Sequence, residues 1–153
     1  KETYDRALEL MMTLNKNARD VMVKYDVHAC TDVTGFGLLG HASEMATGSD
    51  VELHINVDDI DLIEEALQLA TIGMLPEGMY RNRDFAEKYV DAGDVILAKQ
   101  DMLYDPQTSG GLLIAVDSKD ADAFYEELKT SVPSAQRIGV VKEKKGECYL
   151  YLH

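Results

Sequence analysis

The chain has 153 residues and carries 28 acidic against 15 basic side chains, which gives a formal net charge of -13. This length suits one domain that can bury a core, and 46% hydrophobic with 28% charged residues is ordinary for a globular protein. The acidic balance disfavours a nucleic-acid partner, because no basic stripe offsets the repulsion of phosphate, and no apolar run approaches the roughly 20 residues of a membrane-spanning helix.

In the first half of the chain, hydrophobic periodicity predicts two helices and two strands around a glycine-rich turn. Apolar residues recur at three- and four-residue steps over residues 3–24, which is typical of one amphipathic helix. Residues 27–33 form a strand-like run that leads into the turn, and residues 38–46 predict a second helix. Residues 51–57 alternate apolar with polar side chains, which indicates a strand with one buried face.

The middle of the chain is divided by glycine and proline. Asp61 is placed to cap a helix that runs to residue 68 or 70. Glycines and a proline then predict a loop over residues 73–83. A short helix is expected at residues 84–90.

The last third of the chain has a regular order of strands and one helix. Residues 112–116 predict a buried strand, and residues 118–129 predict an amphipathic helix. Residues 137–141 and 148–152 predict a hairpin, with Gly146 available for a positive φ in its turn.

The order of these elements defines the fold class. Helices and strands alternate along most of the chain, which predicts an α/β (α+β) layer fold with helices packed on a mixed β-sheet. No repeat, low-complexity segment or linker divides the chain, so we expect a single domain over residues 1–153.

Two cysteines, Cys30 and Cys148, bear on location and reactivity. Two cysteines in a chain of this length do not make a disulfide framework, so we expect a reducing, cytoplasmic compartment. Each is interpreted as a small packed side chain rather than a nucleophile.

The segment TDVTGFGLLGH, residues 31–41, contains the pattern G-x-G-x-x-G. A lone match is weak evidence for a dinucleotide site, and Asp32 would repel a pyrophosphate unless a cation neutralised it. Glycines at a helix start leave N–H groups for an anion, and the hydroxyls of Thr31 and Thr34 add donors. Asp32 can hold a hydrated divalent cation that bridges to phosphate. The alternative is that Asp32 and Thr34 only cap the helix, and that Gly37 and Gly40 allow close packing.

A second segment, DPQTSGG at residues 105–111, combines hydroxyls with small residues before a strand. Successive N–H groups of Thr108, Ser109, Gly110 and Gly111 predict an anion-binding nest. The segment lacks the lysine of a P-loop. Either loop alone could be a plain turn, but two loops of this kind, each beside an aspartate, together favour an anion site.

The segments HACTDVTGFGLLGHASEMA and LYDPQTSGGLLIAV together resemble the two signature segments of the carboxy-terminal half of selenophosphate synthetase (selenide, water dikinase). This family belongs to the aminoimidazole ribonucleotide synthetase-like superfamily, and the likeness covers nearly the whole chain. It implies a three-layer carboxy-terminal domain and an ATP-dependent enzyme that makes selenophosphate, AMP and orthophosphate from selenide, ATP and water. The aspartate of the family's first segment joins a magnesium cluster, and here that position is Asp32.

The resemblance also implies site residues and partners. The cofactor pocket would be lined by Thr31, Thr34, Gly35, Thr108, Ser109, Gly110 and Gly111, with no catalytic residue in this domain. In the family, ATP and most magnesium ligands lie on an amino-terminal domain that is absent here. We therefore expect an excised, inactive and monomeric fragment of a homodimeric parent.

Three histidines are interpreted as structural, His28 and His41 through hydrogen bonds and His54 on its strand. Two rival readings of the whole chain remain. The chain could be the same domain of another superfamily member, such as a purine-biosynthetic synthetase or a thiamine-phosphate kinase relative. It could also be a non-catalytic binding or dimerisation module that keeps the fold.

Overall fold

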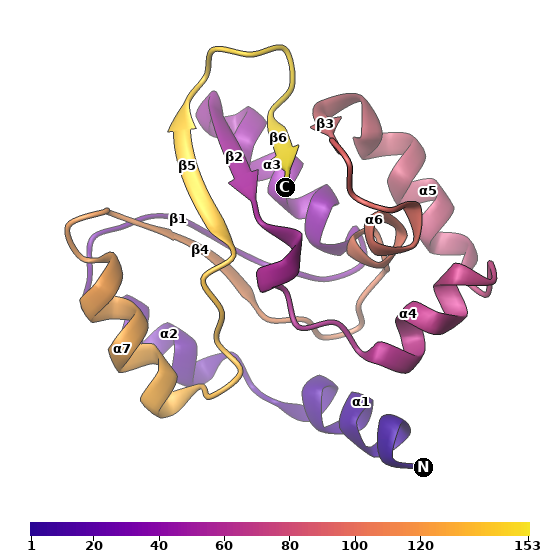
Figure 1. Ribbon diagram of the computed structural model, residues 1–153. Helices are drawn as coiled ribbons and strands as arrows, with labels where there is room; N and C mark the ends of the chain where they lie inside the picture. Colours follow the sequence, from indigo (N-terminus) through magenta and orange to yellow (C-terminus); the bar gives the residue numbers. More distant parts are fainter.

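The computed structural model describes residues 1–153 and contains a four-stranded mixed sheet, a separate two-stranded ribbon, and helices around both (Figure 1). The strands are β1 (Val27–Asp32), β2 (Val51–Ile55), β3 (Val90–Asp91), β4 (Leu112–Val116), β5 (Gly139–Glu143) and β6 (Leu150–Leu152). The helices are α1 (Glu2–Met12), α2 (Lys16–Met22), α3 (Gly37–Ser49), α4 (Glu64–Thr71), α5 (Glu77–Ala86), α6 (Leu97–Leu103) and α7 (Ala121–Ser131). No helix has the length and apolar character needed to cross a membrane.

The two sheets differ in their pairing. The larger one has the strand order β3-β6-β2-β5, in which β2 runs antiparallel to β5 but parallel to β6. The smaller one joins β1 to β4 in antiparallel register, with Asp32 opposite Leu112. The predicted mixed sheet is therefore confirmed, but the strand that ends at Asp32 lies outside it, in the ribbon.

The main core lies between the larger sheet and the helices. Helix α3 contacts β2 and β6 and also contacts α5 and α6, and it lies behind β2 and β6 in Figure 1. Its Leu39, Ala42 and Ala46 are fully buried, together with Leu150 on β6 and Met79 on α5. Because alanines line α3, the helix can pack closely on both neighbours. A single hydrophobic core thus joins the larger sheet to α3, α5 and α6.

A smaller core holds the ribbon. Ala18 and Val21 of α2 pack against Phe124 and Leu128 of α7, and apolar side chains of β4 pack against this group. The ring of Tyr25 meets the ring of Phe124 edge to face, with centroids 5.3 Å apart. The strand of the first glycine segment is therefore supported by elements near both ends of the chain.

Several predicted elements are confirmed, namely the strands at residues 27–33, 51–57 and 112–116 and the helices at residues 38–46 and 118–129. The single helix expected over residues 3–24 is wrong, because the chain leaves α1 at Thr13 and starts α2 at Lys16. The helix after Asp61 begins only at Glu64, so Asp61 does not cap it.

The loop predicted over residues 73–83 is also wrong, because α5 starts at Glu77. Pro76 has φ -68° and stands at the N-cap of this helix, where a proline fits without losing a helical hydrogen bond. The short helix expected at residues 84–90 is the end of α5 followed by a 3-10 turn at Glu87–Tyr89. Proline here marks the beginning of a helix and not its interruption.

The predicted hairpin of residues 137–141 and 148–152 does not form. The two segments contain β5 and β6, and β2 lies between them in the sheet and pairs with both. The glycines with positive φ are Gly37, Gly73 and Gly93, so Gly146 does not use the left-handed region.

Candidate functional site

The two glycine segments lie side by side and are joined through their backbones. The Val33 N–H donates to the Gly111 carbonyl at 2.9 Å, and the Gly110 N–H donates to the Val33 carbonyl at 3.0 Å. The Gln107 N–H donates to the Thr34 carbonyl at 3.0 Å. The segments that the resemblance paired are therefore a single structural unit at the end of the β1–β4 ribbon.

At two positions the loops and their neighbours lie so close together that only glycine fits. Gly37 has φ +71°, and a Cβ atom there would lie 2.7 Å from the carbonyl carbon of Tyr104. A Cβ atom at Gly110 would meet the Val33 carbonyl oxygen. By contrast, a Cβ atom at Gly35 or Gly111 would have no neighbour within 4 Å, so these two positions are open.

Two asparagines outside the glycine segments hold the loops in place. The Asn82 Nδ2 group on α5 donates to the Gly35 carbonyl at 2.8 Å and to the Tyr104 carbonyl at 2.9 Å. The Asn15 Nδ2 group, just before α2, donates to the Gly110 carbonyl at 3.1 Å. The sequence interpretation missed both residues; the buried Asn82 fell in a segment taken for a loop, and hydrophobic periodicity gives no sign of Asn15.

The aspartate expected to bind metal lies at the exposed end of β1. The carboxylate of Asp32 makes no ion pair and no hydrogen bond within the chain. A free carboxylate is the ligand type that Mg2+ prefers, and Mg2+ is often held by one or two carboxylates together with substrate phosphates. Asp32 belongs to no group of three or more neighbouring histidine, cysteine or carboxylate side chains that could hold a metal ion. Asp32 therefore offers one suitable ligand and would need ligands from elsewhere to complete a magnesium site.

Two neighbouring groups have altered acidity. Cys30 is exposed, but partial desolvation and, secondarily, the charge of Asp32 raise the pKa of its thiol, which disfavours the nucleophilic thiolate. Burial also raises the pKa of the Asp105 carboxyl at the start of the second loop. Asp105 therefore gives up its proton less readily than an exposed aspartate.

The hydroxyls of the two loops have different environments. Thr31 donates to the backbone carbonyl of Asp32 at 3.2 Å, while Thr34 lies 3.1 Å from Nε2 of His41. Thr108 and Ser109 are exposed, and their hydroxyls bond to no other protein group. No side chain caps the start of α3, so the alternative that Asp32 and Thr34 serve only as helix caps is wrong.

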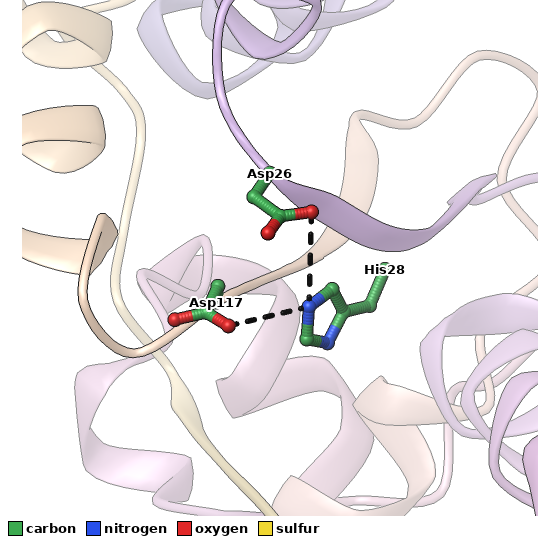
Figure 2. A group of neighbouring side chains, drawn as sticks. All are labelled: Asp26, His28 and Asp117. Atoms are coloured by element: carbon green, nitrogen blue, oxygen red, sulfur yellow. Dashed lines mark ion pairs between the residues drawn. The ribbon is translucent and has the colours of Figure 1, made fainter.

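A separate group of ligand-type side chains lies at the opposite end of the ribbon (Figure 2). Nε2 of His28 is 3.5 Å from a carboxylate oxygen of Asp117 and 4.0 Å from one of Asp26. The Lys119 ammonium pairs with Asp26 at 2.8 Å and lies 3.8 Å from Asp117. Since a lysine already supplies the positive charge, we assign no metal centre here.

Comparison with known proteins places this fold and its paired loops in a defined class. Residues 2–150 match the family described as AIR synthase related protein, C-terminal domain. The chain belongs to this family. The family match confirms the superfamily that the two segments indicated.

The chain is similar to proteins named selenide, water dikinase. The one from Treponema denticola is 47% identical over 131 residues, which cover 86% of this chain and 37% of that protein. Those from Clostridioides difficile and Caldanaerobacter subterraneus are 44% and 46% identical, and the matches cover 95% and 94% of this chain and 42% of each protein. The chain thus spans about two fifths of the curated relatives that it matches.

Solved structures support the fold. The hydrogenase maturation protein HypE matches with a TM-score of 0.53 and 21% identity, covering 86% of this chain and 34% of that one. A second structure, of HypE in complex with ATP, matches with the same TM-score and identity. At this level of identity the likeness concerns the arrangement of helices and strands alone.

Proposed function

We propose that the full-length protein is a selenide, water dikinase (selenophosphate synthetase) and that this chain is its carboxy-terminal domain. Such an enzyme is an ATP-dependent phosphotransferase that makes selenophosphate, AMP and orthophosphate from selenide, ATP and water. The observation that carries the proposal is the 44–47% identity to proteins of that name, over 86–95% of the chain. The joined glycine loops and the unpaired Asp32 are consistent with it.

Asp32 is proposed to be the magnesium ligand that this domain contributes. Bound Mg2+ would offset the charge of a polyphosphate, which an acidic domain otherwise repels. Other magnesium ligands and the ATP site would come from a further part of the full-length protein. The role of the chain is then to present one carboxylate at a fixed position.

The two loops are proposed to line the phosphate side of the same pocket. Open backbone at Gly35 and Gly111 and free hydroxyls at Thr108 and Ser109 suit contact with an anion. The N–H of Gly110 already donates to the Val33 carbonyl and is not free for an anion. Gly110 contributes instead by letting the two loops lie close together. Thr31 and Thr34 complete the lining beside Asp32.

Replacement of Asp32 in the full-length protein tests the metal assignment. Asp32→Asn removes the charge and keeps the shape, so we expect most selenide-dependent conversion of ATP to AMP to be lost while the fold is retained. Phosphorus NMR of the products measures the turnover, over a magnesium titration. Asp94→Asn, at an exposed carboxylate on the loop between β3 and α6, is the matched control.

The outcomes separate the parts of the proposal. Unchanged turnover of Asp32→Asn at both limiting and saturating magnesium would refute the metal role. ATP cleavage by the wild-type protein that does not depend on selenide would favour another member of the superfamily. Calorimetric titration of magnesium-ATP can compare the full-length protein with a truncated form that lacks this domain. Equal affinity of the two forms would favour a non-catalytic module.

The remaining parts concern assembly and location. We propose a monomeric isolated domain, a homodimeric full-length protein and a cytoplasmic location. Light scattering on both forms of the protein measures the oligomeric state. A dimer of the 153-residue chain alone would contradict the first part.

A further inference from the structure

Two histidines, His54 on β2 and His153 directly after β6, face one another through their ring nitrogens. Nδ1 of His54 is hydrogen-bonded to Nε2 of His153 at 3.0 Å, and the two ring planes differ by only 6°. The other nitrogen of His54, Nε2, is hydrogen-bonded to a carboxylate oxygen of Glu52 at 3.3 Å. A carboxylate and two imidazoles are therefore linked in series on one face of the larger sheet.

The charge state of Glu52 decides which nitrogens carry hydrogen. The backbone N–H groups of Gly146 and Lys145 donate to this carboxylate and lower its pKa to about 2, so it is ionised at neutral pH. An ionised carboxylate only accepts hydrogen bonds, so Nε2 of His54 is the donor. In the neutral ring Nδ1 is then an acceptor, and the hydrogen between the two rings belongs to Nε2 of His153.

This arrangement has room for one added proton and not for two. A proton on Nδ1 of His153 leaves the contact between the rings unchanged. With both rings charged, all four ring nitrogens carry hydrogen, so Nδ1 of His54 and Nε2 of His153 become two donors that face each other. Two donors cannot share a hydrogen bond, so the doubly charged pair must separate.

The surroundings of the pair hold the His54 ring and offer it no second partner. The ring of Tyr151 stacks on that of His54, with centroids 4.8 Å apart. Neither facing nitrogen has another hydrogen-bond partner in the chain. The charged or titratable side chains on this face of the sheet and in the loop beside it are Glu52, Tyr151, Lys142, Asp91, Lys144 and Lys145.

The ring contact lies where the pairing of β2 with β6 continues beyond the two strands. The His153 N–H donates to the Ile55 carbonyl, and the Val57 N–H donates to the His153 carbonyl, both at 2.9 Å. Val57 is 2% exposed and belongs to the main core. The ring of His153 thus adds a side-chain contact to two backbone bonds at the edge of that core.

We propose that His54 and His153 form a pH-sensitive switch, which fastens His153 to β2 when the pair holds at most one added proton and releases it when the pair holds two. An unfolded chain can bind both protons, whereas the closed pair binds only one. The closed state is therefore favoured at higher pH and is lost as the pH falls.

Nitrogen NMR of the histidine rings in the full-length protein tests the proton arrangement. At about pH 8, His54 is expected to carry hydrogen on Nε2 and to accept at Nδ1. His153→Gln should shift the Nδ1 signal of His54, whereas His28→Gln, at an exposed histidine on β1, should not. A wild-type His54 ring with hydrogen on Nδ1 at about pH 8 would overturn the proposal.

Amide hydrogen exchange then tests whether the pair fastens the backbone. From about pH 8 to about pH 5, which spans the ordinary titration of histidine, the protection factors of the Val57 and His153 amides should fall. The expected fall is about 2- to 10-fold, the range for one hydrogen bond. The Leu53 N–H, which donates to the Tyr149 carbonyl at the other end of the same pairing, is the internal reference and should keep its protection.

Variants assign that change to the pair. The fall in protection should disappear in His54→Gln and in His153→Gln and persist in His28→Gln. Equal protection of the Val57 amide in the wild type at both pH values would overturn the proposal, and so would a fall that persists in His153→Gln.

Discussion

Gly37→Ala tests the reasoning that close backbone contact between the two loops requires glycine. Gly37 has φ +71°, and the left-handed region costs an L-residue about 1–2 kcal/mol. The added Cβ would lie 2.7 Å from the Tyr104 carbonyl carbon and 2.9 Å from the Asp105 carbonyl oxygen. Both atoms belong to backbone and cannot rotate away, so overpacking adds about 1–3 kcal/mol. The free energy of unfolding should fall by about 2–5 kcal/mol.

The control is the same substitution two residues earlier. Gly35 has no positive φ and no atom within 4 Å of the Cβ position, so Gly35→Ala should change stability by less than about 1 kcal/mol. Urea and thermal unfolding, followed by circular dichroism, measure both variants of the 153-residue chain. At about 2–4 °C per kcal/mol, Gly37→Ala should lower Tm by about 4–20 °C. Equal stability of the two variants would refute the close-contact argument.

Three further changes should give distinct results in the same unfolding assay. Arg83→Ala leaves the buried carboxylate of Asp101 unpaired and should cost about 3–5 kcal/mol, whereas exposed Arg81→Ala should cost less than about 1 kcal/mol. Backbone N–H donors lower the pKa of Glu52 from 4.5 to about 2, so its stabilising effect is complete above pH 4.5 and is lost toward pH 2; Glu52→Gln should remove that dependence. Asn82→Ala should lower the free energy of unfolding by about 1–3 kcal/mol, because the Gly35 and Tyr104 carbonyls lose their side-chain donor.

The sequence predicted local elements well where periodicity and turn chemistry agreed. Residues 51–57 alternate in polarity, and β2 buries Leu53 and Ile55 as that pattern requires, but it also buries Glu52 on the opposite face. The strand that ends at Asp32 and the helix after the glycines were also predicted from local hydrophobic pattern and from the glycine turn between them. These features depend on contacts between near neighbours in the chain.

Elements whose partners are distant in sequence could not be predicted in this way. The residues of β5 and β6 are close in sequence and suggest a hairpin, yet each pairs with β2. Gly78 suggested a loop, but it lies inside α5, where a Cβ would come 3.0 Å from the ring of Pro106. That glycine makes room for the second loop, a reason that only the tertiary structure reveals.

The geometry of the candidate site depends on groups outside the two signature segments. Asn15 and Asn82, in two separate parts of the chain, each donate to carbonyls of the loops. If Asp32 is the magnesium ligand proposed above, ordered loops would leave its carboxylate little freedom to lose when the metal ion binds. We therefore expect Asn82→Ala to lower turnover of the full-length protein even where the fold survives. Retention of wild-type turnover by a folded Asn82→Ala variant would show that the loops are positioned by the rest of the enzyme instead.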